Sequence, residues 1–156
     1  MGIEFQVNGQ ACKVAEGERC TLVEHLRDRL HLKATRFGCG QERCGACVVL
    51  VDGEPRFSCQ LEVAHLRGRA VATAEALGDS GEGRELLAQF ERWQAAQCGF
   101  CTTGILLRAL HFLRTSADGS RAAIAQALDA HLCRCGAQPR ILSAIEVAWQ
   151  ATRGGR

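Results

Sequence analysis

Three cysteines within nine residues constrain the fold of this chain more than any other feature. Cys39, Cys44 and Cys47 have the spacing C-x4-C-x2-C, and Cys59 follows after eleven intervening residues. The positions beside these thiols are small: Gly38, Gly40, Gly45 and Ala46. Glycine reaches backbone conformations that other residues avoid, and it lets amide N–H groups come close to sulfur. This segment is therefore predicted to fold tightly around a single group to which all of these thiols bind.

The spacing also indicates which group this is. It is typical of plant-type ferredoxins, in which four cysteine thiolates hold the two irons of a [2Fe–2S] cluster. Three chance cysteines at this spacing inside a glycine-rich loop would be improbable, so an iron–sulfur site is expected here.

The cysteine content of the whole chain supports metal binding. Ten cysteines make up roughly 6 % of the 156 residues, several times ordinary usage. The first residues, Met1–Gln6, contain neither the basic nor the apolar region of a signal peptide, and no apolar run approaches membrane-spanning length. In a reducing compartment clustered cysteines are metal ligands rather than disulfides. We therefore expect a cytoplasmic protein, or one that is membrane-associated or exported through a partner.

The charge of the chain argues against nucleic acid as a partner. The formal net charge of +2 counts every cysteine as neutral. An oxidised [2Fe–2S] cluster with four thiolates carries about −2, so two clusters would bring the chain to about −2. Neither net charge is that of a typical nucleic-acid-binding protein, and the sequence contains no run of lysines or arginines.

The N-terminal half has the pattern of a small sheet with one helix. Asn8-Gly9 and Asp52-Gly53 are hairpin turn signals between β-rich segments. Thr21–Glu24 matches a capping box, and leucines recur every four residues after it. The predicted elements are strands at 3–7, 10–14, 48–51, 54–58 and 69–73 and a helix at 21–30. The fold class expected from this half is α+β, with the helix covering one face of the sheet.

A polar, glycine-rich segment at 77–83 is interpreted as a linker. The periodicity after it is helical, with one helix expected at 84–95 and an apolar, buried one at 104–114. Ile124, Leu128 and Leu132 indicate a third helix after Ser120, and a fourth contains Ile141, Ile145 and Trp149. The expected division is a metal-binding domain at 1–76 and a helical domain at 84–156.

The helical half has four thiols of its own. Cys98 and Cys101 are three residues apart, so on a helix they would share a face. Cys133 and Cys135 would diverge by roughly 200° on a helix and must therefore occupy a loop, expected before the fourth helix. A metal is predicted between these two pairs. Spacing favours a second iron–sulfur cluster, with a structural zinc as the alternative, although C-x-C is unusual for zinc.

The remaining cysteines and the histidines show no ligand grouping. Cys12 and Cys20 belong to neither set and are interpreted as small buried or part-exposed thiols. Surface or helix-terminus roles are expected for His25, His31, His111 and His131. No catalytic residue is predicted, because no nucleophile triad, HExxH motif or phosphate loop is present.

Taken together, the motifs resemble the small iron–sulfur subunit of the molybdenum hydroxylases, the xanthine dehydrogenase/aldehyde oxidoreductase family. The resemblance covers nearly the whole chain, through Gly38–Cys47, Thr73–Leu77, Gln97–Thr102 and Leu132–Gly136. Within the family, Arg140–Leu142 looks most like the isoquinoline 1-oxidoreductase and nicotinate dehydrogenase branch.

The resemblance implies a β-grasp, plant-type ferredoxin-like domain followed by a four-helix bundle, each with a [2Fe–2S] cluster. The implied ligands are Cys39, Cys44, Cys47 and Cys59 for the first cluster and Cys98, Cys101, Cys133 and Cys135 for the second. In the family the second cluster lies nearer a molybdopterin, which a separate large subunit binds. For this chain's partner we expect the cytosine dinucleotide type. Gln97 matches a glutamine that hydrogen-bonds the pterin, and Cys135 matches the cluster ligand closest to it.

The implied function is electron transfer within an oxidoreductase complex, in which the large subunit performs the chemistry. The electrons would be accepted by a flavin subunit, by a cytochrome subunit or by a soluble carrier. An N-heteroaromatic substrate is expected, with aldehydes and purines as alternatives. A stand-alone ferredoxin and a zinc-stabilised interaction module are the rivals from other classes.

Three positions depart from the family pattern. Glu42 stands where glycine is common, which predicts a less comfortable backbone in the first loop. Thr103 replaces a frequent proline and is expected to cap the helix instead. His131 stands where asparagine is common.

Overall fold

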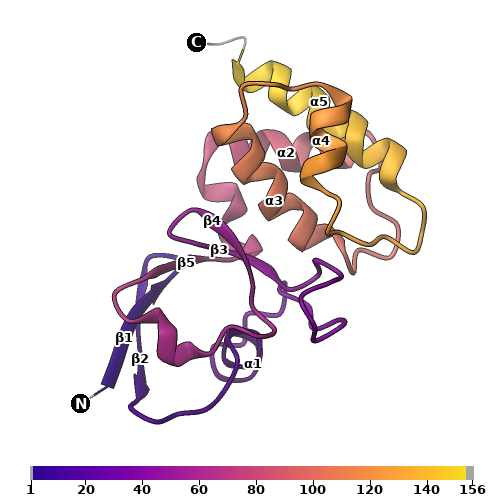
Figure 1. The fold of residues 1–156 in the computed structure, drawn as a ribbon. Coiled ribbons are helices and arrows are strands. Elements are labelled where there is room, and N and C mark those ends of the chain that lie inside the picture. Colours follow the sequence, from indigo (N-terminus) through magenta and orange to yellow (C-terminus); the bar gives the residue numbers. More distant parts are fainter. Residues whose placement is uncertain (1, 154–156) are drawn as a thin grey trace.

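The computed structural model describes residues 2–153, which form a five-stranded sheet followed by a group of helices (Figure 1). The strands are β1 (Gly2–Val7), β2 (Gln10–Ala15), β3 (Val48–Val51), β4 (Glu54–Phe57) and β5 (Ala70–Ala72). Their order in the sheet is β2-β1-β5-β3-β4. The β1 and β5 strands run parallel, and the other neighbours are antiparallel. The α+β class is therefore confirmed, and each predicted strand is found to within one residue at either end.

Both hairpins turn where the sequence predicts. Asn8 and Gly9 have φ angles of 51° and 78°, and Asp52 and Gly53 have φ angles of 51° and 83°. Two consecutive left-handed residues match the right-handed twist of the flanking strands, and Asn-Gly and Asp-Gly are the pairs that adopt this conformation most readily.

The predicted helix at 21–30 is present but is not α-helical throughout. The Glu24 carboxylate accepts hydrogen bonds from both the backbone N–H and the hydroxyl of Thr21, at 2.8 Å each. Helix α1 (Leu22–Glu24) then passes into a π-helical turn, η1 (His25–Arg29). Leu22 and Leu26 are buried in one core with β1, so this segment covers one face of the sheet as expected.

The other face of the sheet is covered by helices. A 3-10 turn, η3 (Ala74–Asp79), leads into α2 (Gly81–Arg92), α3 (Thr102–Thr115), α4 (Arg121–Ala127) and α5 (Gln138–Arg153). Side chains alternate along β3, so Val49 and Val51 join the core beneath α1 whereas Val48 and Leu50 join the core with α3. Strand β3, which lies between β5 and β4, therefore belongs to both cores and ties the two halves together.

Two boundaries in the helical half differ from the expectation. Helix α2 begins at Gly81, inside the expected linker, because Ser80 caps it by accepting the Gly83 N–H at 3.1 Å. A Cβ on Gly83 would lie 1.8 Å from the Leu77 carbonyl oxygen, so this glycine serves close packing rather than flexibility. The prediction that Leu132 belongs to the third helix is wrong, since α4 ends at Ala127 and the Leu132 side chain is 63 % exposed.

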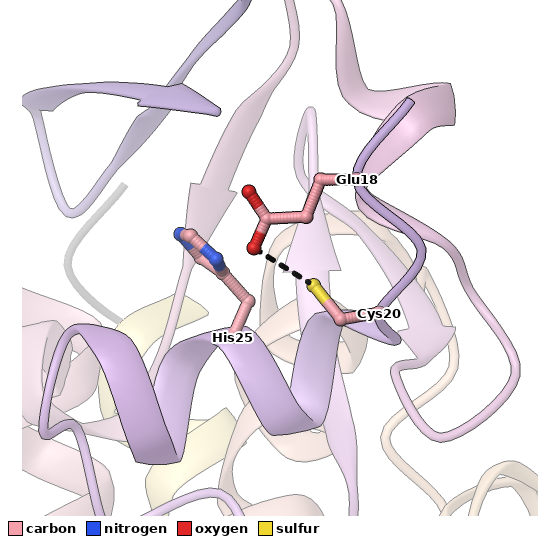
Figure 2. Close-up of side chains that lie close together, drawn as sticks. All are labelled: Glu18, Cys20 and His25. Carbon is pink, nitrogen blue, oxygen red and sulfur yellow. Dashed lines mark hydrogen bonds between the residues drawn. The ribbon is translucent and has the colours of Figure 1, made fainter. Parts of the chain in front are cut away.

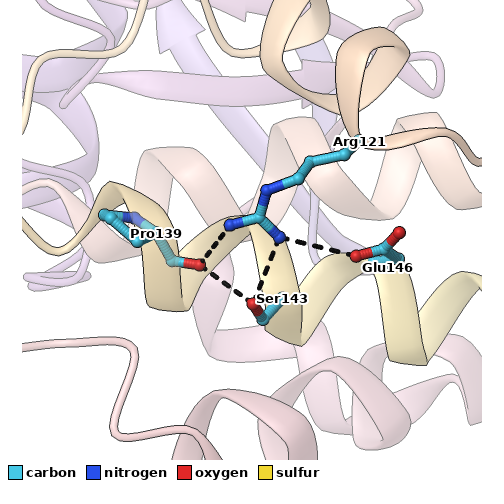
Figure 3. Close-up of polar contacts among 4 residues, drawn as sticks. All are labelled: Arg121, Pro139, Ser143 and Glu146. Carbon is cyan, nitrogen blue, oxygen red and sulfur yellow. Dashed lines mark hydrogen bonds and ion pairs between the residues drawn. The ribbon is translucent and has the colours of Figure 1, made fainter.

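The start of α4 is held against the first turns of α5 by one arginine (Figure 3). The Arg121 guanidinium donates to the Pro139 carbonyl oxygen at 3.0 Å and to the Ser143 hydroxyl at 3.2 Å. It also pairs with the Glu146 carboxylate at 3.5 Å. These contacts fix the N-terminus of α5 and, with it, the loop that precedes this helix. Among residues 2–153, no helix is both long and apolar enough to cross a bilayer.

The cysteine loop of the N-terminal half packs directly onto α3. A Cβ on Gly104 would lie 2.0 Å from the Gly45 carbonyl oxygen, a backbone atom that no side-chain rotation can move. Helix and loop therefore meet at a point where only glycine fits.

The Gly104→Ala variant is predicted to be destabilised by at least about 2 kcal/mol, because overpacking against backbone forces the two segments apart. Urea unfolding followed by circular dichroism would measure this change. Gly78→Ala is the matched control, since a Cβ there meets no atom within 4 Å and the variant should unfold like the parent. Equal stability of the two variants would contradict the close contact.

Candidate iron–sulfur sites

The first cysteine loop bends its backbone amides toward its own sulfur atoms. Gly40, Glu42 and Gly45 have left-handed φ angles of 64°, 57° and 77°. The amides of Gln41 and Arg43 donate to Cys39 Sγ at 3.4 and 3.2 Å. The Cys39 amide donates to Cys44 Sγ at 3.4 Å. Such bonds stabilise the thiolate form, and the Arg43 and Gln41 amides lower the pKa of Cys39 to about 7.

The other two thiols of this set lie inside the protein. Cys47 and Cys59 are 1 % and 2 % exposed and pack against Val23 of α1. Burial raises the pKa of Cys47 to about 12, and the neighbouring Cys59 thiol adds to the shift. Without a metal the Cys47 thiol therefore remains protonated, and a bound metal would have to displace its proton. The thiols that the spacing grouped thus form two neighbouring pairs, Cys39 with Cys44 toward the outside and Cys47 with Cys59 in the interior.

Two further side chains that the sequence did not single out support this loop. The Ser58 hydroxyl is buried and donates to the Cys47 carbonyl oxygen at 2.6 Å. The Gln60 amide donates to the Gly40 carbonyl oxygen at 2.6 Å. The only sequence signal was their position on either side of Cys59.

The second set of thiols is also brought together, although not in the predicted way. Cys98 and Cys101 lie in a loop before α3 rather than on a helix, because Gly99 adopts a left-handed φ of 79°. The prediction of a shared helix face is therefore wrong. Cys133 and Cys135 lie in a loop immediately before α5, as expected. Both pairs consequently lie at the N-terminal ends of helices.

The thiols of the second set associate as two pairs. Cys98 lies beside Cys135, and Cys101 lies beside Cys133, close enough for each thiol to shift the pKa of its neighbour. Burial raises the pKa of Cys101 to about 12. Burial also acts on Cys133, but the amide of Ala137, with those of Cys135 and Gly136, outweighs it and lowers the Cys133 pKa.

The pairing bears on which metal fits the second set. A tetrahedral zinc would hold all four sulfurs about 3.8 Å apart. Among residues 2–153, the only three metal-binding side chains with donor atoms all within 4.8 Å of one another belong to neither thiol set. The four sulfurs of the second set are therefore not spaced for a single zinc ion. Two separate pairs fit a group with two metal ions, each bound by two thiolates, better than they fit a single ion.

The two sets of thiols are neighbours in space. The Leu132 amide donates to the Cys44 carbonyl oxygen at 3.0 Å, which joins the loop of Cys133 directly to the loop of Cys44. A Cβ on Gly38 would lie 3.7 Å from the ring of Phe100, next to Cys101. The first cysteine loop thus lies against both loops of the second set, the one that contains Cys101 and the one that contains Cys133.

Two histidines for which surface or helix-terminus roles were expected are buried, although His25 does lie at the end of α1. His131 is 7 % exposed, and a Cβ on Gly45 would lie 2.3 Å from its Nδ1 atom, so the imidazole fills the space beside the first loop. Burial, with a smaller effect of the Arg108 charge, lowers the pKa of His131 to about 4. The Arg108 Nε atom donates to His131 Nε2 at 3.4 Å. His25 is buried as well, at 5 % exposure.

The residues that the family pattern singled out have different structural roles. Glu42 does adopt a left-handed backbone, as its position predicted. Thr103 does not cap α3, because its hydroxyl donates instead to the Ala34 carbonyl oxygen at 2.8 Å. Gln97 lies exposed beside Cys98, on the outer side of the second set.

Replacing Glu42 by glycine is predicted to stabilise the protein by about 0.5–1 kcal/mol, because a left-handed conformation costs a residue with a Cβ more than it costs glycine. The urea midpoint of the iron-loaded protein would report the gain. Glu62→Gly is the matched control, since this glutamate has an ordinary φ of −73° and its replacement should destabilise. A loss of stability in both variants would contradict the strain at Glu42.

Comparison with known proteins agrees with the geometry. Residues 5–74 match the family model of the 2Fe–2S iron–sulfur cluster binding domain, and residues 73–146 match that of the [2Fe–2S] binding domain. A nicotinate dehydrogenase subunit of Pseudomonas putida is 37 % identical over 97 % of this chain and 96 % of that protein. The alpha subunit of isoquinoline 1-oxidoreductase from Brevundimonas diminuta is 38 % identical over 94 % and 96 %.

A solved structure agrees with these sequence matches. In quinoline 2-oxidoreductase from Pseudomonas putida 86, one chain superposes with a TM-score of 0.90 at 33 % identity, covering 99 % of this chain and 97 % of that one. The expected resemblance is confirmed along the whole length, in both thiol-bearing halves. This chain therefore belongs to the family of small [2Fe–2S] subunits of the molybdenum hydroxylases.

Proposed function

We propose that this chain is the electron-transfer subunit of a molybdenum hydroxylase complex. It would relay electrons from a molybdopterin centre on a large partner subunit to an external acceptor, and it would contribute no catalytic residue itself. The chain is an enzyme component in this sense only. The observation that carries the proposal is the direct contact between a loop of the first set of four thiols and a loop of the second set.

The proposed ligands follow from which thiols lie together. The first cluster would be held by Cys39, Cys44, Cys47 and Cys59, and the second by Cys98, Cys101, Cys133 and Cys135. A bound [2Fe–2S] cluster exchanges one electron at a time, so two of them suit a two-electron oxidation. Amide groups that point at Cys39 and Cys133 support the assignment, because bonds of this kind stabilise thiolates and tune cluster potentials.

The hydrogen bond between Leu132 and Cys44 gives the relay a short path. It joins the backbone of one proposed first-cluster ligand to the residue directly before a proposed second-cluster ligand. This route from the Cys44 thiol to the Cys133 thiol is covalent except for that single hydrogen bond. A chain whose two metal sites served unrelated purposes would not need such a connection.

The outer side of the second set has the features of a docking surface for the large subunit. Gln97 and Cys98 are exposed there. The apolar side chains of Phe100 and Leu132 are 47 % and 63 % exposed beside them. Exposed apolar side chains around a functional group indicate a site that a partner covers. We propose that Gln97 and Cys135 face the pterin of the partner, which would be of the cytosine dinucleotide type.

The division of the chain follows from the same two sets. We propose a ferredoxin-like β-grasp domain at 1–76 and a helical domain, organised as a four-helix bundle, at 84–156. The segment 77–83 connects them without being flexible, since Leu77 is buried and α2 begins at Gly81.

The names of the relatives favour an N-heteroaromatic substrate for the complex. Nicotinate, isoquinoline and quinoline are all aromatic rings that contain nitrogen, and each occurs in the name of a protein that matches this chain over most of its length. The acceptor would be a flavin subunit, a cytochrome subunit or a soluble carrier. A cytoplasmic location is proposed, or one at a membrane or outside the cytoplasm reached through a partner.

Cys101→Ser is predicted to remove one of two clusters. The parent chain should contain about four irons, and the variant about two, because each [2Fe–2S] cluster has two irons. Electron paramagnetic resonance of the dithionite-reduced protein should then show one spin-half centre instead of two. Cys12→Ser is the matched control and should keep both signals. Two intact signals in Cys101→Ser would refute the ligand assignment, and a colourless parent chain would refute the clusters altogether.

Leu132→Asp is predicted to weaken binding of the large subunit without loss of iron, because a charge would be buried in an apolar contact. Native mass spectrometry of the co-expressed complex, with molybdenum analysis, would measure the fraction assembled. Leu87→Asp changes an exposed leucine on α2 and should assemble normally. Normal assembly of both variants would contradict docking through this surface.

A further inference from the structure

A third group of metal-binding side chains lies outside both thiol sets. Glu18, Cys20 and His25 each place one donor atom within 4.8 Å of the other two. Figure 2 shows the Glu18 carboxylate between the imidazole of His25 and the thiol of Cys20. The Cys20 thiol donates to the carboxylate at 3.8 Å. These residues precede and begin the helical segment of the N-terminal half, so they do not belong to the proposed iron sites.

The imidazole of His25 is held so that one nitrogen remains free. Its Nε2 atom contacts Cys12 Sγ at 3.3 Å, and its ring packs on Phe5 with the ring centroids 5.8 Å apart. Its Nδ1 atom is buried and has no hydrogen-bond partner in the part of the chain that the structure describes. A buried polar atom without a hydrogen-bond partner costs folding free energy. The unpaired Nδ1 atom therefore indicates a position where a bound ion would stabilise the protein.

The backbone around the group is fixed before any ion binds. The Cys20 carbonyl oxygen accepts the Val63 amide at 3.2 Å, and the Leu22 amide donates to the Leu61 carbonyl oxygen at 2.7 Å. The π-helical turn begins at His25 itself, and single π turns inside helices are frequent at functional sites. The site is also accessible from outside, because His25 lines two adjoining surface hollows.

The distances and the donor types fit one kind of ion. Around a tetrahedral zinc, sulfur, nitrogen and oxygen donors are about 3.3–3.8 Å apart. The three donors here need move by no more than about 1 Å to reach those separations. A thiolate, an imidazole and a carboxylate together suit zinc, whereas magnesium and calcium prefer oxygen alone. The Arg29 guanidinium lies 3.9 Å from Glu18 and would compete with an ion, but this arginine is largely exposed and free to move into water.

We propose that Glu18, Cys20 and His25 bind a divalent cation of the zinc type through Nδ1 of the histidine. Cys12 acts as a positioning residue, because its contact with Nε2 orients the ring so that Nδ1 faces the other two donors. A metal-bound histidine is normally oriented through its second nitrogen in this manner. A solvent molecule would complete the coordination, as at zinc sites with three protein ligands.

Equilibrium dialysis of the iron-loaded, full-length chain against zinc alone would test this proposal, with zinc and iron measured by mass spectrometry. One zinc per chain is expected, with the iron content unchanged. Cys20→Ser and Glu18→Gln should weaken zinc binding at least about tenfold, and Cys12→Ala, which removes the contact with Nε2, should weaken it about 10- to 100-fold by releasing the ring. Glu16→Gln is the matched control, because this neighbouring carboxylate is exposed and pairs with Arg67.

Iron content reports whether each variant has folded, so a folding defect is distinguishable from loss of the ion. Zinc should also slow the alkylation of Cys20 in the parent chain, as measured by peptide mass spectrometry. Equal zinc binding by the parent and Cys20→Ser would overturn the proposal, as would zinc uptake matched by iron loss. Alkylation of Cys20 at the same rate with and without zinc would overturn it as well.

Discussion

The relation between the two thiol sets depends on the close approach of backbone at Gly45 and Gly104. A Cβ on Gly104 would meet the Gly45 carbonyl oxygen, and a Cβ on Gly45 would meet the ring of His131. Three segments therefore converge at a point with no space for side chains: the first cysteine loop, the start of α3 and the loop before α5. Because Cys101 directly precedes α3 and Cys133 follows His131 by two residues, this contact fixes both sets in one rigid frame.

The sulfur atoms within that frame are prepared for metal in two ways. Cys39 and Cys133 receive hydrogen bonds from several backbone amides, which favour the thiolate before any metal arrives. Cys47 and Cys101 are buried, and burial raises the pKa of each to about 12. These inner thiols give up their protons only to a bound metal, so the inner half of each site forms together with its metal. Each set thus combines a thiol whose thiolate form the backbone amides stabilise with a buried thiol that the core holds in place.

The sequence predicted those features of the fold, such as turns and loops, that depend only on residues close together in the chain. Asn8-Gly9 located a hairpin, Cys39 to Cys47 located the first loop, and the C-x-C spacing correctly placed Cys133 and Cys135 in a loop. Contacts between distant segments were not predictable in this way. Gly83 looks like a linker residue in sequence, yet it is required where α2 approaches Leu77. His131 is buried only because the loop at Gly45 lies against it, and the ligand roles of the eight cysteines still rest on their spacing and proximity.

The short helical segment that begins with α1 connects the first thiol set with the group around His25. Val23 packs against Cys47 and Cys59, whereas His25, two residues later and roughly 200° around a helix, faces Cys12. The two residues therefore look to opposite sides of the same segment. An ion bound at His25 would restrain the turn that backs the buried thiols, since the segment is short and packed on both sides. All-thiolate donors and a mixed sulfur, nitrogen and oxygen set select different metals, so both kinds of site can coexist in one small domain.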